Sequence, residues 1–315
     1  MTVTALHRCG TSRTLPKGKR VANGEEMRVN ALIFGSTGQL GTALRLSAPP
    51  TVTVAALDRT SCDICDRARL QASIAQAQPR IIFNAVAYTA VDRAEKEPEA
   101  AQLVNATAVG WLAEAAQAVN ARLIHVSTDF VFDGESSTPY RPQDPTNPLS
   151  VYGRTKRDGE VAAATNPDTL IVRTAWVHSP IGSNFVLTML RLMSERTELR
   201  VVGDQIGTPT AVAGLAAALW TLGLGTTRGI CHYTDSGVAS WYDFAVAIQE
   251  EALHLGLLRR SAKVLPITAA EYPTPARRPR FSVLDKRDTW EVLGSPAAHW
   301  RDGLRHTLKE RKRLV

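Results

Sequence analysis

The amino-acid sequence predicts an α/β fold: a doubly wound parallel sheet followed by a smaller C-terminal portion. Two observations lead to this prediction. Short apolar runs alternate with helical patterns from residue 29 to about 178, and a glycine-rich turn follows the first run. Unbroken apolar runs are typical of strands buried on both faces. Their alternation with helices predicts parallel strands joined by right-handed crossovers. The 315 residues suffice for one large domain or two modest ones.

The first half of the chain contains five predicted strands and three predicted helices. The strands are short, apolar and rich in β-branched residues; they lie in residues 29–35, 52–58, 79–88, 121–132 and 169–178. The helical patterns lie between them, in residues 41–48, 66–78 and 98–120. Beyond residue 178 the pattern changes to helices near 184–196 and 210–224 with frequent proline and glycine.

These patterns divide the chain into four parts. We expect a disordered extension over residues 1–27, a dinucleotide-binding domain over 28–178, and a basic tail over 306–315. Residues 179–305 form the smaller portion, which we expect to bind substrate and to return in part to the sheet.

The net charge of +7 is concentrated at the two ends of the chain. Residues 1–28 and residues 301–315 each hold six basic side chains against two acidic ones, which leaves the middle slightly acidic. This distribution argues against nucleic-acid binding. No apolar run reaches the roughly 18–20 residues of a membrane span.

Only two of the four cysteines, Cys62 and Cys65, have the spacing of a metal or redox pair. A zinc site needs a second pair, which the sequence lacks, so we expect reduced cysteines in a cytoplasmic protein.

The turn after the first strand, Gly35-Ser-Thr-Gly38-Gln-Leu-Gly41, is typical of a dinucleotide-binding site. Glycine permits the turn and lets backbone N–H groups approach a ligand closely. The start of the following helix offers unpaired N–H donors to a pyrophosphate. Gln39 and Leu40 lie inside this turn, and its place between a strand and a helix makes the fold Rossmann-like.

The second strand ends at Asp58-Arg59, which leaves the choice of cofactor open. A carboxylate there binds the ribose 2′-hydroxyl of NAD, whereas an arginine binds the 2′-phosphate of NADP. Arg59 favours NADPH, with NADH as the alternative. Nearby Asp63 either accepts from the adenine amino group or caps a helix, and Ile64 beside it is also expected to contact the cofactor.

Polar residues at the fourth strand and the next helix form a candidate catalytic set. Thr128 and Asp129 end the strand, where ligands bind in open α/β sheets. Tyr152 and Lys156 are one helical turn apart and therefore lie on one helix face. A strand-end hydroxyl followed by such a pair is the pattern of short-chain dehydrogenases.

Eight motifs, the glycine turn among them, resemble the dTDP-4-dehydrorhamnose reductase family of extended short-chain dehydrogenases. They occur in the family's order and span residues 29–305. They include "NAVAYTAVDRAE" (84–95), "HVSTDFVFDG" (125–134), "VRTAWVH" (172–178), "DQIGTPT" (204–210) and "RRPRFSVLD" (277–285).

The resemblance implies NAD(P)H-dependent reduction of the C4 ketone of dTDP-6-deoxy-L-lyxo-4-hexulose to dTDP-L-rhamnose. The developing oxyanion needs a proton and a hydrogen-bond donor. Tyr152 gives the proton, Thr128 donates to the substrate oxygen, and Lys156 holds the nicotinamide ribose. Lys156 is also expected to lower the tyrosine pKa from its usual value near ~10.

The same resemblance assigns the remaining contacts. The middle of the cofactor is expected to lie against Ala87, Tyr88 and Thr89, and the sugar against Asp129 and Trp176. Trp176 is alternatively a core aromatic residue. The nucleotide and its diphosphate are expected to meet Asn184, Gln205, Thr210, Arg278 and Arg280, although the two arginines also fit an ordinary surface.

Three points stay open. Phe130 stands where the family commonly has tyrosine, which affects substrate preference. Some members use magnesium at a dimer contact; a homodimer fits the resemblance, but no carboxylate cluster here is assignable to Mg²⁺. The alternatives to the reductase are another nucleotide-sugar reductase or epimerase, and a non-catalytic NADP-binding regulatory subunit.

Overall fold

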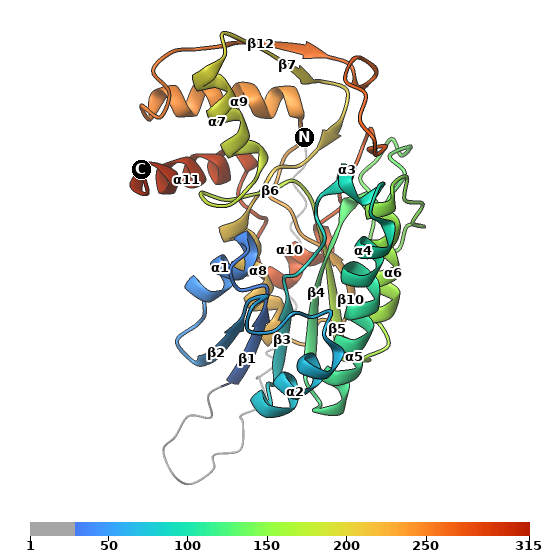
Figure 1. Ribbon diagram of the computed structural model, residues 1–315. Helices are drawn as coiled ribbons and strands as arrows, with labels where there is room; N and C mark the ends of the chain where they lie inside the picture. Colours follow the sequence, from blue (N-terminus) through green and yellow to red (C-terminus); the bar gives the residue numbers. More distant parts are fainter. Residues whose placement is uncertain (1–28) are drawn as a thin grey trace, which may run out of the picture.

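A six-stranded parallel sheet forms the centre of the protein (Figure 1). The computed structural model describes residues 29–315, so the expected extension 1–27 lies outside the described residues. The strand order is β10-β5-β4-β3-β1-β2. The strands are β1 (Val29–Phe34), β2 (Val52–Leu57), β3 (Ile81–Asn84), β4 (Arg122–Thr128), β5 (Thr169–Thr174) and β10 (Gly229–His232). The predicted fold class is confirmed, and β10 is the return of the C-terminal portion to the sheet.

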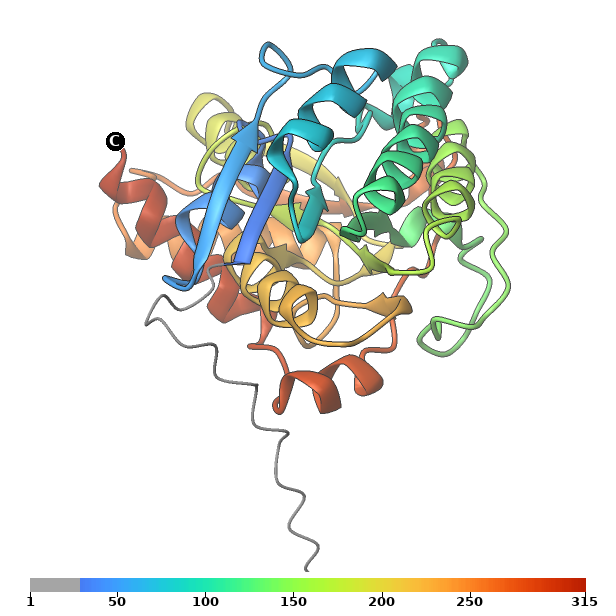
Figure 2. The same cartoon turned by 90° about the horizontal axis from the view of Figure 1, so that it is seen from below.

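Helices cover both faces of this sheet (Figures 1 and 2). One face packs against α1 (Gln39–Leu46), α8 (Val212–Leu224) and α10 (Arg287–Leu293). The other packs against α2 (Arg67–Ala77), α5 (Ala108–Ala118) and α6 (Val151–Ala163). Short helical turns precede α5, namely α3 (Val91–Ala94), α4 (Pro98–Gln102) and the π-helix η1 (Leu103–Thr107). Two layers of apolar side chains, one on each face, therefore exclude water from the strands.

Much of the C-terminal portion gathers above the sheet in Figure 1, past the ends of its strands. Its own core joins three helices to a parallel strand pair: α7 (Phe185–Glu195), β7 (Glu198–Val202), α9 (Trp241–His254), β12 (Lys263–Ile267) and α11 (Trp300–Arg313). Two more short strand pairs are present, namely β6 (Val177–His178) with β9 (Thr210–Ala211) and β8 (Ile206–Gly207) with β11 (Ala239–Ser240). The turns η2 (Asp129–Val131) and η3 (Ala269–Glu271) complete the elements. Within residues 29–315, no helix has the length and apolar character needed to cross a bilayer.

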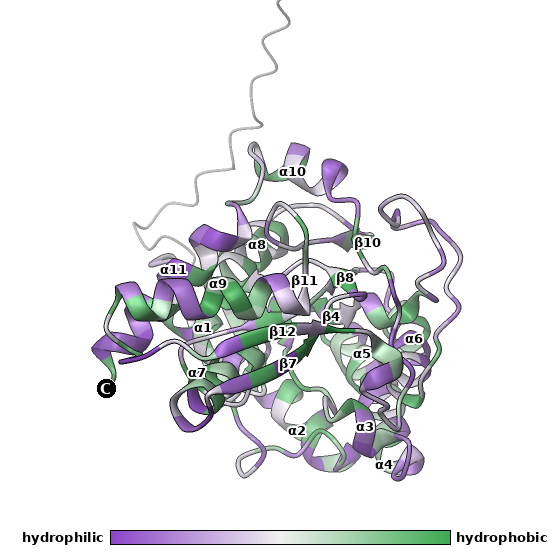
Figure 3. Cartoon of the chain, turned by 90° about the horizontal axis from the view of Figure 1, so that it is seen from above, coloured by the Kyte–Doolittle hydropathy of each residue, from purple (hydrophilic) through white to green (hydrophobic). Residues whose placement is uncertain are grey.

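Helix α11 corrects the expected basic tail, because residues 306–313 continue the helix that begins at Trp300. Leu304 and Leu308 are fully buried, one turn apart, against the core of the C-terminal portion. The outer face is hydrophilic (Figure 3), and there Arg305 pairs with Glu251 of α9 at 2.8 Å. The sequence suggested a tail because basic residues hide this amphipathic pattern.

Helix α6 lies unusually close to its neighbours because of two glycines. A Cβ on Gly153 would overlap the carbonyl oxygen of Phe130, and a Cβ on Gly159 would overlap that of Asn105. The helix begins at Ser150, whose hydroxyl accepts from the N–H of Gly153 at 3.2 Å. The helix that carries Tyr152 and Lys156 is therefore fixed directly against the end of β4.

We expect Gly153→Ala to displace α6, because the new methyl group would overlap backbone rather than a mobile side chain. Overpacking of this kind costs about 1–3 kcal/mol of unfolding free energy, measurable by urea denaturation, and should also lower turnover. Gly110→Ala in α5 is the matched control, because its Cβ would lie 3.7 Å from Ala162 in ordinary contact. That control should be neutral or stabilising by about 0.5–1 kcal/mol; equal behaviour of the two variants would contradict the close approach.

Candidate active site

Several predicted site residues follow the carboxyl ends of four neighbouring strands, β1, β3, β4 and β5. The chain runs from β1 outward to β2 on one side and to β3 on the other, so the order reverses between β1 and β3. Ligands of open α/β sheets bind at such a reversal. The fold therefore brings the glycine turn, residues 87–89 and Thr128 to one edge.

The glycine turn has the geometry of an anion-binding cradle. Gly35 adopts a positive φ of 81°, and a Cβ on Gly41 would overlap the carbonyl of Gly35. Gly38 begins α1 without a side chain to cap it, so the first N–H groups of the helix keep their donors free for an anion. These residues fit a dinucleotide diphosphate, and Leu40 packs beneath them against the core.

After the end of β2, three charged residues, Asp58, Arg59 and Asp63, make different contacts. Asp58 accepts from the N–H of Ser61 at 2.8 Å and from the hydroxyls of Ser61 and Thr60, and these bonds lower its pKa to about 2. Asp63 accepts from the N–H of Cys65 and pairs with Arg59. The Arg59 side chain is 88% exposed. The acidic groups thus organise the turn, and the guanidinium is the group that faces solvent.

The alternative expectation, that Asp63 caps the next helix, is wrong. Helix α2 begins at Asp66, whose carboxylate accepts from the N–H of Arg69. Ile64 is buried in the core under α2.

The segment 87–89 after β3 is held by Asn105, a residue of the π-helix. Its side chain accepts from the N–H of Tyr88 at 2.8 Å, donates to the carbonyl of Tyr88, and donates to the hydroxyl of Thr155 in α6. The Tyr88 hydroxyl points outward and donates to Glu97. What the segment offers at the strand ends is therefore largely backbone.

Thr128 and Asp129 form a buried polar pair at the end of β4. The Thr128 hydroxyl donates to Asp129 Oδ1 at 3.0 Å and accepts from the N–H of Phe130. Asp129 is 2% exposed, and burial raises its pKa to about 6, although the nearby Ser282 and Thr128 hydroxyls oppose the shift. Its Oδ2 atom has no partner within the described chain. Asp129 Oδ2 is thus a buried acceptor without a hydrogen-bond partner among residues 29–315, which a native structure needs a reason to keep.

Tyr152 lies beside this pair. Its ring meets Phe130 edge to face, with 5.5 Å between the centroids. Burial raises the pKa of Tyr152 to about 12, contact with Thr128 lowers it, and the negative charge of Asp129 raises it. The expected lowering of this pKa by Lys156 is therefore wrong in this structure, and desolvation dominates.

Lys156 points into the sheet rather than toward the phenol. Its Nζ donates to the carbonyl of Val126 at 2.7 Å and lies 3.4 Å from Nε2 of His125. Burial lowers the pKa of Lys156 to about 8, and Glu160 opposes this shift. The helix places Tyr152 and Lys156 on one face as predicted, with Phe130 against the first and the Val126 carbonyl of β4 against the second.

Trp176 follows β5 in a left-handed conformation with φ 49°. Its indole stacks on Trp241 of α9 with 3.5 Å between the ring centroids. Gly207 lies under the ring, where a Cβ would be 2.6 Å from it. Trp176 is therefore a packed aromatic residue, as one alternative expected, and it is only partly buried. Its contact with the sugar stays a prediction.

Two predicted ligand residues are already engaged within the protein. Asn184 caps α7 and donates to Oε1 of Gln39 at 2.8 Å and to the carbonyls of Ser179 and Ile181. Arg278 forms a two-bond ion pair with Asp92. Their hydrogen bonds connect the two portions of the chain, because Gln39 and Asp92 both belong to the sheet portion.

The comparisons with known proteins agree with this geometry. The model of the RmlD substrate binding domain family matches residues 27–313. The chain belongs to the dTDP-4-dehydrorhamnose reductase family. The dTDP-4-dehydrorhamnose reductase of Sinorhizobium fredii is 42% identical, over 87% of this chain and 94% of its own. That of Escherichia coli K12 is 41% identical, over 90% and 98%.

Solved structures of the reductase family share this fold. A dTDP-4-dehydrorhamnose reductase from Clostridium acetobutylicum has a TM-score of 0.85 at 36% identity, covering 90% of this chain and all of its own. The Bacillus anthracis protein, solved in complex with NADP, has the same TM-score at 34% identity and the same coverage. The resemblance predicted from the motifs is confirmed.

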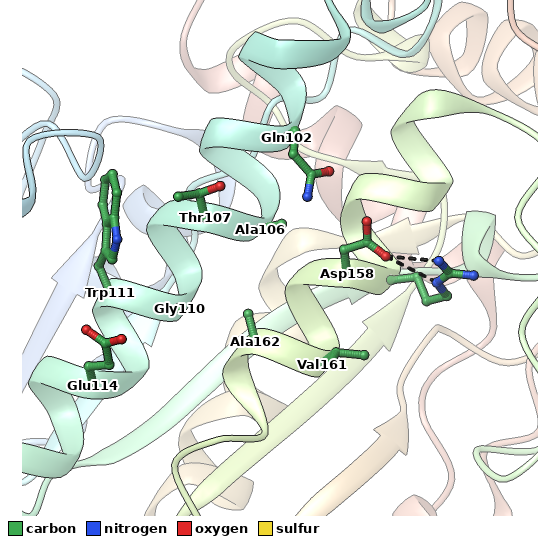
Figure 4. Close-up of a pocket in the computed structure, with 10 residues that line it drawn as sticks. Gln102, Ala106, Thr107, Gly110, Trp111, Glu114, Asp158, Val161 and Ala162 are labelled. Atoms are coloured by element: carbon green, nitrogen blue, oxygen red, sulfur yellow. Dashed lines mark hydrogen bonds and ion pairs between the residues drawn. The ribbon is translucent and has the colours of Figure 1, made fainter.

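A separate hollow of about 550 Å³ lies on the outer face of α5 and α6 (Figure 4). Its wall includes Trp111, Glu114, Asp158 and Val161, with Gly110 opposite Ala162. None of the candidate catalytic residues lines it, so this hollow is separate from the candidate site at the strand ends.

Sequence reasoning missed Asn105, Asn84, His125 and Trp241. The first three are buried polar residues inside helical or strand patterns. Buried polar side chains need partners, so their position in apolar runs was the available signal. The sequence holds no comparable signal for Trp241, because its stacking on Trp176 joins segments that are far apart in the chain.

We expect Asp129→Asn to stabilise the fold at neutral pH while lowering activity. The folded-state pKa of about 6 exceeds the unfolded value of 3.8. Protonation of Asp129 therefore favours the folded state at low pH, and this contribution is lost as the pH rises through 6. Removing the carboxylate should raise the unfolding free energy by about 1–3 kcal/mol at pH 8 and leave it nearly unchanged at pH 4. Urea denaturation at both pH values measures this; equal effects would contradict the buried carboxylate.

Proposed function

We propose that this protein reduces the C4 ketone of dTDP-6-deoxy-L-lyxo-4-hexulose with NADPH, giving dTDP-L-rhamnose. The observation that carries the proposal is the buried Thr128–Asp129 pair at the end of β4, with Tyr152 packed against the adjacent Phe130 and Lys156 one turn along the same helix. The relatives named dTDP-4-dehydrorhamnose reductase cover nearly the whole chain and support the choice of substrate.

In this proposal the protein positions the ketone and handles one proton. The reduced nicotinamide supplies the hydride when bound. Tyr152, whose raised pKa keeps the phenol protonated at neutral pH, donates its proton to the ketone oxygen. Thr128 donates a second hydrogen bond to that oxygen once its hydroxyl turns from Asp129. Lys156 meets the nicotinamide ribose, Asp129 a sugar hydroxyl, and Trp176 the sugar face.

The cofactor would lie along the reversal between β1 and β3. Its diphosphate fits the N-terminus of α1 at Gly38–Gly41, and Ala87 and Thr89 border its middle. We favour NADPH over NADH because Asp58 is occupied within its own turn while Arg59 is exposed. The Bacillus anthracis relative was solved with NADP. We place the protein in the cytoplasm, where the free thiols of Cys62, Cys65 and Cys231 would stay reduced.

A direct assay tests the reaction. Purified protein is mixed with NADPH and the 4-keto sugar nucleotide, and oxidation is followed at the nicotinamide band. We expect turnover in the wild type and its loss in Tyr152→Phe with NADPH affinity retained, because only the proton donor is removed. Tyr272→Phe, a change at an exposed tyrosine, is the control and should keep full activity. NADPH binding without oxidation by the wild type would favour the non-catalytic subunit; interconversion of sugar epimers without net oxidation would favour an epimerase.

Arg59→Ala should weaken NADPH binding about tenfold and leave NADH binding unchanged, because only NADPH carries the 2′-phosphate. Calorimetric titration with each cofactor measures both constants. Arg191→Ala, another exposed arginine but in α7, should change neither. An equal loss for the two cofactors would contradict the phosphate contact.

A further inference from the structure

His125 is a buried residue that the proposed mechanism does not use. It lies in β4, three residues before Thr128, with no exposed surface. On one side its Nδ1 meets Nδ2 of Asn84 in β3 at 3.1 Å. On the other its Nε2 meets Nζ of Lys156 in α6 at 3.4 Å. It therefore stands between the neighbouring strand and the lysine of the site.

The direction of these hydrogen bonds is fixed by a backbone group. The N–H of Val86, which can only donate, points to Oδ1 of Asn84 at 3.1 Å. The other end of that amide must then be the NH₂ group, which donates to Nδ1 of His125. A neutral imidazole that accepts at Nδ1 carries its proton on Nε2. Thus the chain of donors runs one way, from Val86 through Asn84 and His125 to Lys156.

This chain of hydrogen bonds ends at Nζ of Lys156, which is itself a donor. Lys156 uses one N–H on the Val126 carbonyl at 2.7 Å. An ammonium group offers three donors and no acceptor, whereas a neutral amine has a lone pair to receive the Nε2–H. The arrangement therefore suits an amine that gains and loses its proton easily.

We propose that Asn84 and His125 are positioning residues for Lys156: they fix the Nε2–H tautomer of His125, which holds the amine against β4 and sets the protonation state in which it meets the cofactor ribose. The proposal rests on the proposed role of Lys156 toward the cofactor and not on the identity of the sugar. His125 itself stays neutral, because burial and the nearby Lys156 keep its pKa well below the usual value.

The other charged and titratable groups around Lys156 come from three elements. Glu160 of α6 raises the pKa of Lys156, but its carboxylate is bound by Arg173 of β5 at 2.7 Å. Tyr152 lies on the same helix and Asp129 just beyond β4, both near the reacting end of the site. With Glu160 committed to Arg173, the group that contacts the lysine nitrogen directly is His125.

The tautomer is measured directly by NMR on protein labelled with ¹⁵N-histidine, between pH 7 and 9. We expect His125 to show a protonated Nε2 and an unprotonated Nδ1 throughout. A proton on Nδ1, or a cationic ring, would overturn the proposal. This measurement needs neither substrate nor a variant.

Asn84→Asp should reverse the direction of the two hydrogen bonds that His125 makes. A carboxylate accepts from both the Val86 N–H and His125 Nδ1, so the proton moves to Nδ1 and Nε2 becomes an acceptor that favours the ammonium form. His125→Gln keeps a similar side-chain volume, and its amide can present its oxygen to Lys156, which also favours the ammonium form. This second variant tests the proposal if the buried carboxylate of Asn84→Asp prevents folding. His178→Gln is the control, because that histidine is equally buried and has no polar partner among the described residues.

The readout is NADP⁺ affinity against pH, by calorimetry. In the wild type we expect affinity to fall as the pH rises through about 8, the value for Lys156. In Asn84→Asp and His125→Gln the fall should move about one unit higher, and in His178→Gln it should not move. An unmoved or lowered profile in the two variants would overturn the proposal. Because no sugar is present, failure here is distinguishable from absence of ketone reduction.

Discussion

The arrangement of the site depends on the close approach of α6 to the end of β4. Gly153 lies against the carbonyl of Phe130 and Gly159 against that of Asn105, with no room for a Cβ at either position. This approach brings the Tyr152 ring to Phe130, next to Thr128, and the Lys156 amine to the Val126 carbonyl. A helix displaced by one methyl group would lose hydrogen bonds whose geometry tolerates only tenths of an ångström.

The site collects buried polar groups that oppose folding. Burial raises the pKa of Asp129 and lowers that of Lys156, so it favours the neutral form of both side chains. In each case this desolvation outweighs the effect of neighbouring groups. The nearby Arg173–Glu160 pair is also buried, but there each charge has its counter-charge within hydrogen-bonding distance. A buried ion pair such as Arg173–Glu160 has a structural role. Buried polar groups that lack a full set of hydrogen-bond partners are instead typical of functional sites. The apolar layers on both faces of the sheet supply the stability that this arrangement requires.

The portions of the protein are connected by side chains that sequence reasoning assigned to ligands. Gln39 and Asn184 hold the glycine turn to α7, and Arg278 holds the segment before α10 to Asp92. Motif resemblance locates such residues near the site but does not say whether their donors are free. The same limit explains the expected tail at 306–315, where basic composition obscured Leu304 and Leu308 on the inner face of α11.

Local sequence patterns were enough to predict the parallel sheet, the glycine turn and the one-turn spacing of Tyr152 and Lys156. These features follow from local patterns: apolar runs, glycine spacing and helical periodicity. Tertiary structure decided the rest. Whether Asn184 binds a ligand or Gln39, whether Trp176 stacks on Trp241, and which way His125 donates all depend on segments tens to more than a hundred residues apart. Their contacts arise only when the chain is folded, because direction and burial are properties of the surroundings rather than of the residue.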